Sequence, residues 1–242
     1  MISAINVYTD INELLNALAE NICSTAQAAI RERGQFNFVL AGGNSPKKLY
    51  ELLASEKFSN KIDWDKTYFF FGDERFVPEN DPQRNYLMVK KALFVPLKIK
   101  NSNVFNVDTS ESPETAALRY DKSIRYHFKE KTVEFDFVLL GLGDNAHTAS
   151  LFPNTTVLEE TDATIKAVYV NEVNMYRITM TAPLINQARN IAFLVYGKDK
   201  AAAIYHVLND SKGTINEYPA RLISSDKHKT HWYIDSESAS KL

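Results

Sequence analysis

A histidine, His147, follows an almost continuously apolar segment, residues 135–140, after a turn that contains Gly141 and Gly143. Such a run is typical of a central parallel strand that is covered on both faces. Open α/β sheets hold their ligands just beyond the carboxyl ends of these strands, and the glycines let the backbone approach a bound molecule closely. Because a neutral imidazole can accept a proton, the segment predicts a general base at a ligand site. The alternative is a histidine that serves only as a satisfied polar group.

A glycine turn after an earlier apolar strand forms a second candidate site, made of Gly42, Gly43, Asn44 and Ser45. We expect Ser45 to cap the next helix, with Pro46 in its first position. The start of that helix would offer unpaired backbone N–H groups, a hydroxyl and the positive end of a dipole. The pattern is neither a dinucleotide fingerprint nor a Walker A loop. It therefore favours a small phosphorylated molecule, with an ordinary tight turn as the alternative.

Charged residues follow two further strands. Asp73 and Arg75 come directly after residues 67–71, and Lys200 follows residues 191–196. An arginine can hold a phosphate or stabilise a reacting oxygen, and an aspartate can orient a donor or accept a proton. A lysine in the first turn of a helix is unfavourable unless an anion lies nearby. Solvated, mutually paired charges are the alternative, but several strand ends with anion-compatible groups favour one common site.

The composition is that of a chain with one large core. Of the 242 residues, 45% are hydrophobic, and 28 basic against 30 acidic side chains give a net charge of -2. We expect one domain over residues 1–242. The chain has no long run of like charges, so we expect no binding to nucleic acid. It has neither a leader pattern nor about 20 consecutive apolar residues, so we expect a cytoplasmic protein that does not bind membranes. One cysteine, Cys23, and the absence of HxH or HxxxH pairs argue against a zinc site.

Strand patterns alternate with helix patterns along the chain. This order implies parallel pairing through right-handed crossovers, and so a three-layer α/β/α sandwich with a mainly parallel, Rossmann-like sheet. The predicted strands are 36–41, 67–71, 135–140, 165–170, 177–181, 191–196 and 232–234, and the predicted helices are 10–32, the segment from 46, 86–94, 113–129 and 199–208.

Together these motifs resemble the 6-phosphogluconolactonase family, whose relatives include glucosamine-6-phosphate deaminase. The resemblance is carried by segments 40–46, 72–78, 141–153, 177–181 and 197–201 with 218–220. It implies the deaminase-like α/β sandwich and 6-phosphoglucono-1,5-lactone as substrate. By the resemblance, His147 corresponds to the catalytic histidine and Arg75 to the arginine that contacts the substrate. The phosphate-side positions correspond to Gly43, Asn44, Ser45, Arg177 and Lys200.

This chain departs from the family pattern beside the histidine. Where the family usually has Asp-Gly-His, the sequence reads Asn145-Ala146-His147. An asparagine can accept a hydrogen bond from the imidazole, but it has no charge with which to stabilise an imidazolium. In serine proteases the analogous change lowers the rate by about 10⁴. Asp144, one residue away, is an alternative source of that charge.

The expected function is hydrolysis of the phosphorylated lactone in the oxidative pentose phosphate pathway. His147 would activate water, with Asp73 and Asn145 as candidates to orient it and Arg75 stabilising the oxyanion. No GxSxG elbow surrounds Ser150, which makes a serine nucleophile the weaker hypothesis. We expect no metal or organic cofactor, and a monomer or small homo-oligomer.

Two alternatives remain at this point. A sugar-phosphate deaminase or isomerase also uses a histidine here, but in the deaminases a glutamate follows within a few residues, whereas this chain has no acidic residue after His147 until Glu159. The second alternative is a sugar-phosphate sensor that has lost catalysis, which Asn145 would explain.

Overall fold

The computed structural model describes residues 4–224 and 230–242, and its centre is a six-stranded parallel sheet with strand order β1-β9-β8-β5-β2-β3. All residues of the central strands β2, β5 and β8 are buried, as expected for strands that are covered on both faces. The strands are β1 (Ala4–Tyr8), β2 (Phe36–Leu40), β3 (Thr67–Phe71), β5 (Phe137–Leu140), β8 (Ile191–Val195) and β9 (Thr230–Asp235).

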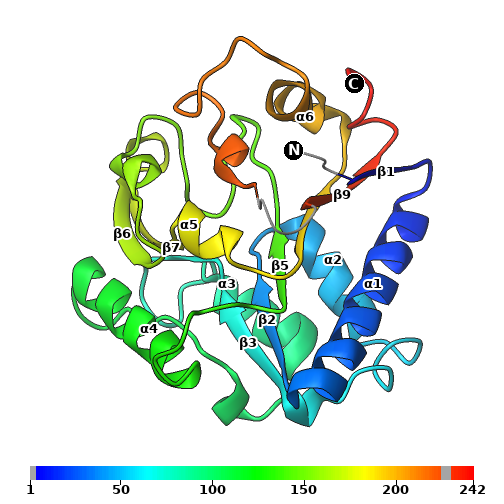
Figure 1. Cartoon of the computed structure of the whole chain (residues 1–242), viewed down its shortest axis with the longest axis vertical. Coiled ribbons are helices and arrows are strands. Elements are labelled where there is room, and N and C mark those ends of the chain that lie inside the picture. The colour runs from blue at the N-terminus through cyan, green and yellow to red at the C-terminus, as the bar shows by residue number, and fades with distance from the viewer. Residues whose placement is uncertain (1–3, 225–229) are drawn as a thin grey trace.

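The sheet divides the apolar core into two clusters, because successive side chains of a strand point to opposite faces. Val138 and Leu140 of β5 pack in one cluster, and Phe137 and Leu139 in the other. Helices cover both clusters: α1 and α2 lie on one side, and α4 on the other (Figure 1). The predicted three-layer architecture is therefore confirmed. The helices are α1 (Ile11–Arg33), α2 (Asn44–Leu53), α3 (Asn85–Val89), α4 (Pro113–His127), α5 (Ala182–Asn186) and α6 (Ala201–Leu208).

A second, smaller sheet is antiparallel and has the order β4-β7-β6. It comprises β4 (Asp73–Arg75), β6 (Ile165–Val170) and β7 (Met175–Met180), and α4 packs against it. The sequence predicts both β6 and β7 as strands, but the expectation that the predicted strands pair in parallel is wrong for these two. Only a short turn, Asn171–Val173, joins them, and a connection of that length permits antiparallel pairing but not a parallel crossover.

Both ends of α1 are capped, whereas the start of α2 differs from the prediction. Asp10 caps α1 by accepting hydrogen bonds from two backbone N–H groups, and Gly34 ends it with a φ of 78°. Ser45 is not the cap of α2: the helix begins two residues earlier than predicted, at Asn44, and Gly43 occupies the cap position with a φ of 102°. A positive φ of this size suits glycine and strains other residues.

Short helices fill the connections. The predicted helix 86–94 consists of α3 followed by one π-helical turn, Lys90–Phe94. The 3₁₀ turns are Trp64–Lys66, Asn101–Asn103, Thr156–Glu159, Asn171–Val173, Lys198–Lys200 and Pro219–Leu222. Within residues 4–224 and 230–242, none of the helices combines the length and apolarity needed to cross a bilayer.

Candidate active site

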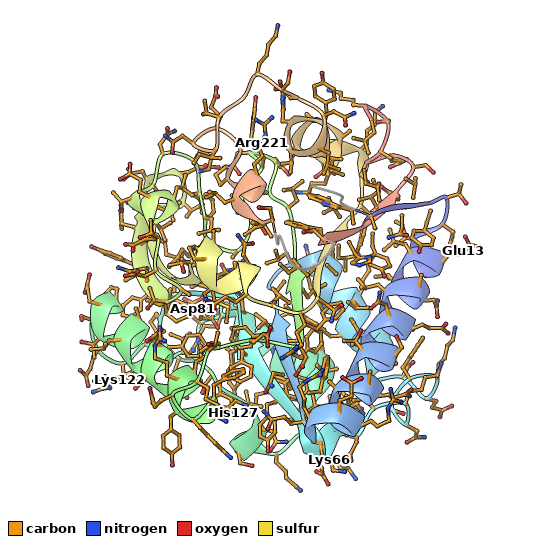
Figure 2. The ribbon with its side chains drawn as sticks, viewed as in Figure 1. Glu13, Lys66, Asp81, Lys122, His127 and Arg221 are labelled. Atoms are coloured by element: carbon orange, nitrogen blue, oxygen red, sulfur yellow. The ribbon has the colours of Figure 1, made fainter. Side chains whose placement is uncertain are left out.

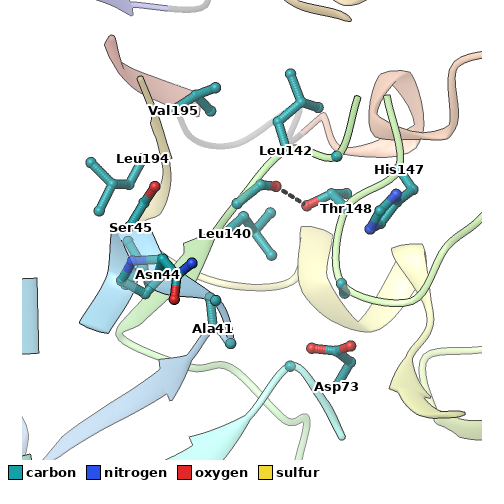
Figure 3. A pocket seen from close by; sticks show the side chains of 18 of the residues that line it. Ala41, Asn44, Ser45, Asp73, Leu140, Leu142, His147, Thr148, Leu194 and Val195 are labelled. Carbon is teal, nitrogen blue, oxygen red and sulfur yellow. Dashed lines mark hydrogen bonds between the residues drawn. The ribbon is translucent and has the colours of Figure 1, made fainter. Parts of the chain in front are cut away.

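The loops after β2, β3, β5 and β8 surround a cavity of about 550 Å³ at the carboxyl edge of the sheet. Figure 3 shows Asn44 and Ser45 on one side of it and His147 on the other, with Asp73 between them at the lower edge. The structure thus brings most of the predicted site residues together. Those that line the cavity are Gly42, Gly43, Asn44, Ser45, Asp73, Arg75, His147, Arg177 and Lys200. Asn145 is not in that lining and contacts the imidazole instead.

The imidazole of His147 is held on several sides. Its ring stacks on Phe152, with centroids 3.8 Å apart and an interplanar angle of 17°. It also lies so close to Gly143 that a Cβ there would come within 2.1 Å of Cε1 and Nδ1, so a glycine is required at that position. Nδ1 lies 2.6 Å from Oδ1 of Asn145. The orientation of the ring is therefore fixed by packing and by one hydrogen bond.

The hydrogen bonds of Asn145 define which nitrogen of His147 carries the proton. The backbone N–H of His147 donates to Oδ1 of Asn145 at 3.2 Å, which identifies this atom as the acceptor. An amide oxygen only accepts hydrogen bonds, so the Nδ1 facing it must be the protonated nitrogen. Nε2 of the neutral ring then keeps a lone pair, which is the form that a general base requires.

The surroundings of His147 keep it neutral. Burial lowers its pKa from 6.5 to about 4, and the positive charges of Arg177 and Lys200 act in the same direction. Asp73 and Asp144 partly oppose this by raising the pKa. Removal from water disfavours the charged imidazolium. At neutral pH the ring is accordingly free to accept a proton.

The loop that carries His147 contains backbone strain. Ala146 and Ala149 adopt φ values of 59° and 48°, a left-handed conformation that is unfavourable for residues with a Cβ. Hydrogen bonds hold the loop in this form: the Ala220 N–H donates to the carbonyl of Ala146 at 3.0 Å, and the Thr148 hydroxyl donates to that of Gly141 at 2.8 Å. Strain of this kind persists where surrounding contacts determine the backbone, and it is frequent at functional sites.

Asp73 lies at the start of β4 and is fixed by neighbouring donors. The Ser150 hydroxyl donates to its Oδ2 at 2.6 Å, and the Asn85 amide donates to its Oδ1 at 3.3 Å. Ser150 is fully buried and its hydroxyl is engaged in this bond, so it is poorly placed to act as a nucleophile. Asp73 lines the cavity and raises the pKa of His147.

The other two charges of the 73–75 segment separate onto opposite faces of β4. Glu74 is buried and accepts hydrogen bonds from the backbone N–H groups of Asn85 at 2.7 Å and Tyr86 at 2.9 Å. It thereby stabilises the start of α3, where backbone N–H groups lack partners within the helix. Arg75 instead lines the cavity, and its Nη1 donates to the carbonyl of Gln83 at 2.6 Å.

Three cationic groups line the cavity that also contains His147. Arg75 and Arg177 each have a buried Nε without a hydrogen-bond partner in the part of the chain that the structure describes. Burial lowers the pKa of Arg177, and the charge of Arg75 adds to that effect. Lys200 lies directly before α6 and forms an ion pair with Asp144. Unpartnered guanidinium nitrogens beside a cavity are suited to an anionic ligand.

The start of α2 faces the same cavity. Gly43 occupies its cap position and provides no side chain, so no side-chain cap satisfies the first N–H groups of the helix. Asn44 and Ser45 add an amide and a hydroxyl to the lining. A helix start of this kind offers the hydrogen-bond donors and the partial positive charge that bind phosphates.

Sequence reasoning missed two residues of this site. Phe152 was treated only as part of the loop, although its aromatic side chain near a histidine was a usable signal. Glu172 belongs to the turn between β6 and β7, and its Oε2 accepts a hydrogen bond of 2.6 Å from Nδ2 of Asn145. Nothing in its local sequence indicates that contact, which links residues 27 positions apart. Among the described residues, no group of three or more acidic, histidine or cysteine side chains is arranged to hold a metal ion.

Comparison with known proteins agrees with this geometry. The family model described as glucosamine-6-phosphate isomerases/6-phosphogluconolactonase matches residues 9–232. The chain therefore belongs to this family.

Individual relatives match along nearly their whole length. A 6-phosphogluconolactonase of Nostoc is 35% identical over 246 residues, which cover 100% of this chain and 99% of the relative. One from Synechocystis is 36% identical, with 91% of each chain covered. The crystal structure of 6-phosphogluconolactonase from Thermotoga maritima superimposes with a TM-score of 0.83 at 29% identity, covering 97% of this chain and 100% of the other.

Proposed function

We propose that this protein hydrolyses 6-phospho-D-glucono-1,5-lactone to 6-phospho-D-gluconate in the oxidative pentose phosphate pathway. The observation that carries the proposal is the position of a neutral imidazole, His147, in the same cavity as Arg75, Arg177 and Lys200. A base and an anion site in one cavity suit a substrate with a phosphate at one end and a reactive carbonyl at the other. The names of the relatives support this substrate.

The phosphate of the substrate binds at the cationic side of the cavity. The N-terminus of α2, Arg177 and Lys200 supply N–H donors and positive charge there. Binding energy from the phosphate, which takes no part in the chemistry, then orients the lactone carbonyl toward His147. On binding, the phosphate competes with Asp144 for Lys200, since Asp144 and Lys200 form an ion pair.

During the reaction His147 accepts a proton from water and later donates it to the leaving ring oxygen. Nε2 of His147 removes a proton from water while the water oxygen attacks C1 of the lactone, and the carbonyl electrons move onto the oxygen. Arg75 stabilises that oxyanion, together with nearby backbone donors. When the tetrahedral intermediate collapses, the bond from C1 to the ring oxygen breaks, and the imidazolium returns its proton to that oxygen. The products are a carboxylic acid, ionised at neutral pH, and a free hydroxyl.

The family also contains isomerases and deaminases, which makes them the natural alternative. The loop after His147 gives them no support, because Thr148 to Leu158 contain no acidic residue. Glu172 reaches the imidazole through Asn145. Glu172 also lines the cavity, but its carboxylate accepts the hydrogen bond of the Asn145 amide and can in that way orient the base.

The proposal also covers the domain organisation, the oligomeric state and the cellular location of the protein. One family model spans residues 9–232, which supports a single domain over 1–242. A phosphorylated sugar lactone is charged and stays in the compartment where it is made, so we place the protein in the cytoplasm, as a monomer or small homo-oligomer.

The test is a pair of turnover assays on the purified protein. One follows opening of the phosphorylated lactone above its spontaneous rate, and the other follows ammonia release from glucosamine 6-phosphate. We expect activity in the first assay alone. Deamination without lactone opening would overturn the assignment, and tight binding of 6-phosphogluconate without turnover of either compound would identify a sensor instead.

A further inference from the structure

A chain of hydrogen bonds runs from the base to an acidic side chain outside its own loop. Nδ1 of His147 donates to Oδ1 of Asn145 at 2.6 Å, and Nδ2 of Asn145 donates to Oε2 of Glu172 at 2.6 Å. Asn145 therefore lies between the imidazole and a carboxylate. The carboxylate comes from the turn that joins β6 to β7, so the second sheet contributes to the environment of the base.

The direction of the amide follows from this contact. An ionised carboxylate accepts hydrogen bonds and donates none, so only the NH₂ group of Asn145 can face Glu172. The oxygen of the amide must then point to His147, where it selects the tautomer protonated at Nδ1. If the amide turned over, its NH₂ group would face Nδ1, and the ring would be protonated at Nε2, the nitrogen that must accept the proton from water.

The other acids near His147 are committed to different partners. Asp73 accepts hydrogen bonds from Ser150 and Asn85, and Asp144 pairs with Lys200. The cations Arg177 and Lys200 face the ring and oppose its protonation. Glu172 is the acid that connects to Nδ1 through a single amide.

We infer, on the basis of the proposed function, that Glu172 is a positioning residue for the catalytic base: its carboxylate fixes the amide of Asn145 and, through that amide, adds a negative charge to those of Asp73 and Asp144 near the imidazolium of His147. The arrangement places the charge one residue further from the ring than an aspartate in place of Asn145 would. It explains how a chain with asparagine beside its histidine can retain catalysis.

Solvent limits how strongly the charge of Glu172 can affect kcat. Glu172 is an exposed residue, and screening by water weakens exposed charges. We therefore expect Glu172→Gln to lower kcat about 3- to 10-fold, because the glutamine keeps an acceptor for Asn145 but loses the charge. Glu172→Leu should cost more, since it removes the acceptor as well. Glu159→Gln makes the same charge change at an exposed residue outside the cavity and should leave kcat unchanged.

A change of background separates this role from a structural one. In Asn145→Asp the charge lies directly beside the ring, and the second oxygen of the introduced carboxylate would face Glu172 as a like charge. Adding Glu172→Gln to that variant should leave kcat unchanged or raise it. A loss of the same size in both backgrounds, or no loss in either, would overturn the inference.

The free protein gives a second readout that does not depend on activity. Nitrogen NMR of His147 should show the ring protonated at Nδ1, and Glu172→Gln should shift its titration midpoint to lower pH. A protein that showed this shift but opened no lactone would contradict the proposed function alone. An unchanged tautomer and midpoint in both Glu172 variants would contradict the role of Glu172, whatever the protein hydrolyses.

Discussion

Arg75 and Arg177 lie directly opposite each other in the antiparallel pair of β4 and β7. Side chains of opposite residues share one face of a sheet, and like charges there are destabilising. Both residues line the cavity, and neither Nε has a partner among the described residues. The protein thus retains an unfavourable pair, which the proposed function explains by an anion that binds between or beside the two guanidinium groups.

The first prediction concerns Arg177. Arg177→Met removes one of the two like charges, so the free energy of unfolding should stay within about 1 kcal/mol of wild type or increase. The stabilisation by 6-phosphogluconate should fall sharply. In wild type a ligand at 100 times its Kd adds about 2.7 kcal/mol. Thermal unfolding with and without the ligand measures both quantities, and full ligand stabilisation in the variant would show that Arg177 does not contact the anion.

The second prediction compares two neighbouring lysines. Lys200 lines the cavity, whereas Lys198 is exposed and outside the lining. Lys200→Met should raise KM for the lactone about tenfold, equivalent to about 1.4 kcal/mol of binding free energy, with a smaller change in kcat. Lys198→Met makes the same chemical change and should leave KM near its wild-type value. Equal increases in KM for the two substitutions would mean that Lys200 acts only through the overall charge of the protein and not through contact with the substrate.

The third prediction is the pH dependence of the reaction. Because the pKa of His147 is lowered to about 4, the base is deprotonated at all pH values well above 4. The ratio kcat/KM, which reports the free enzyme, should therefore be flat from neutral pH downward and fall with a midpoint near 4. Asp73 raises that pKa, so Asp73→Asn should move the midpoint lower. A midpoint near 6.5 would indicate a solvated histidine.

The fourth prediction concerns His127, which lies far from the site. Figure 2 shows it at the lower end of the molecule, where β2 and β3 begin. Burial lowers its pKa from 6.5 to about 4, and its Nε2 lies 2.7 Å from Oδ1 of Asn37. The unfolded chain binds a proton at higher pH than the folded one, so the associated stability is complete above pH 6.5 and is lost as the pH falls toward 4.

Denaturant titrations between pH 6.5 and 4 test whether the free energy of unfolding falls as the pH falls. His127→Gln cannot take up the proton, so its free energy of unfolding should fall less steeply between pH 6.5 and 4 than that of wild type. One histidine changes the slope by at most about 1.4 kcal/mol per pH unit. Parallel curves for the two proteins would show that His127 titrates alike in both states.

The sequence predicts the parallel sheet because its strands are defined by local patterns. The fully buried runs of β2, β5 and β8 bury both faces, and the helices between them leave parallel crossovers as the available connection. The segment of β4 has no such signal: Asp73, Glu74 and Arg75 resemble a solvated loop, and their strand forms only because β7 pairs with them. Edge strand β1 was likewise not predicted, and its Ile5 and Val7 remain exposed.

The residues of the site also fall into two groups, those that local sequence patterns predict and those that they do not. Its components at strand ends could be predicted, since parallel strands bring their carboxyl ends to one edge of a sheet. The contacts that position His147 and its neighbours could not be predicted. Glu172 reaches Asn145 from a hairpin turn, and the Ser150 hydroxyl reaches Asp73 from 77 positions away. These contacts depend on how the antiparallel sheet packs beside the parallel one, which no local pattern encodes.

The central claim is that the imidazole of His147 activates water, and one measurement tests it most directly: the rate of 6-phosphogluconolactone opening by His147→Ala, compared with wild type after subtraction of the spontaneous reaction. Loss of a positioned general base should lower kcat about 10²- to 10⁴-fold, while binding of 6-phosphogluconate, which depends on the start of α2 and on the cationic side chains, persists. Lactone opening at the wild-type rate by a variant that still binds this product would contradict the account.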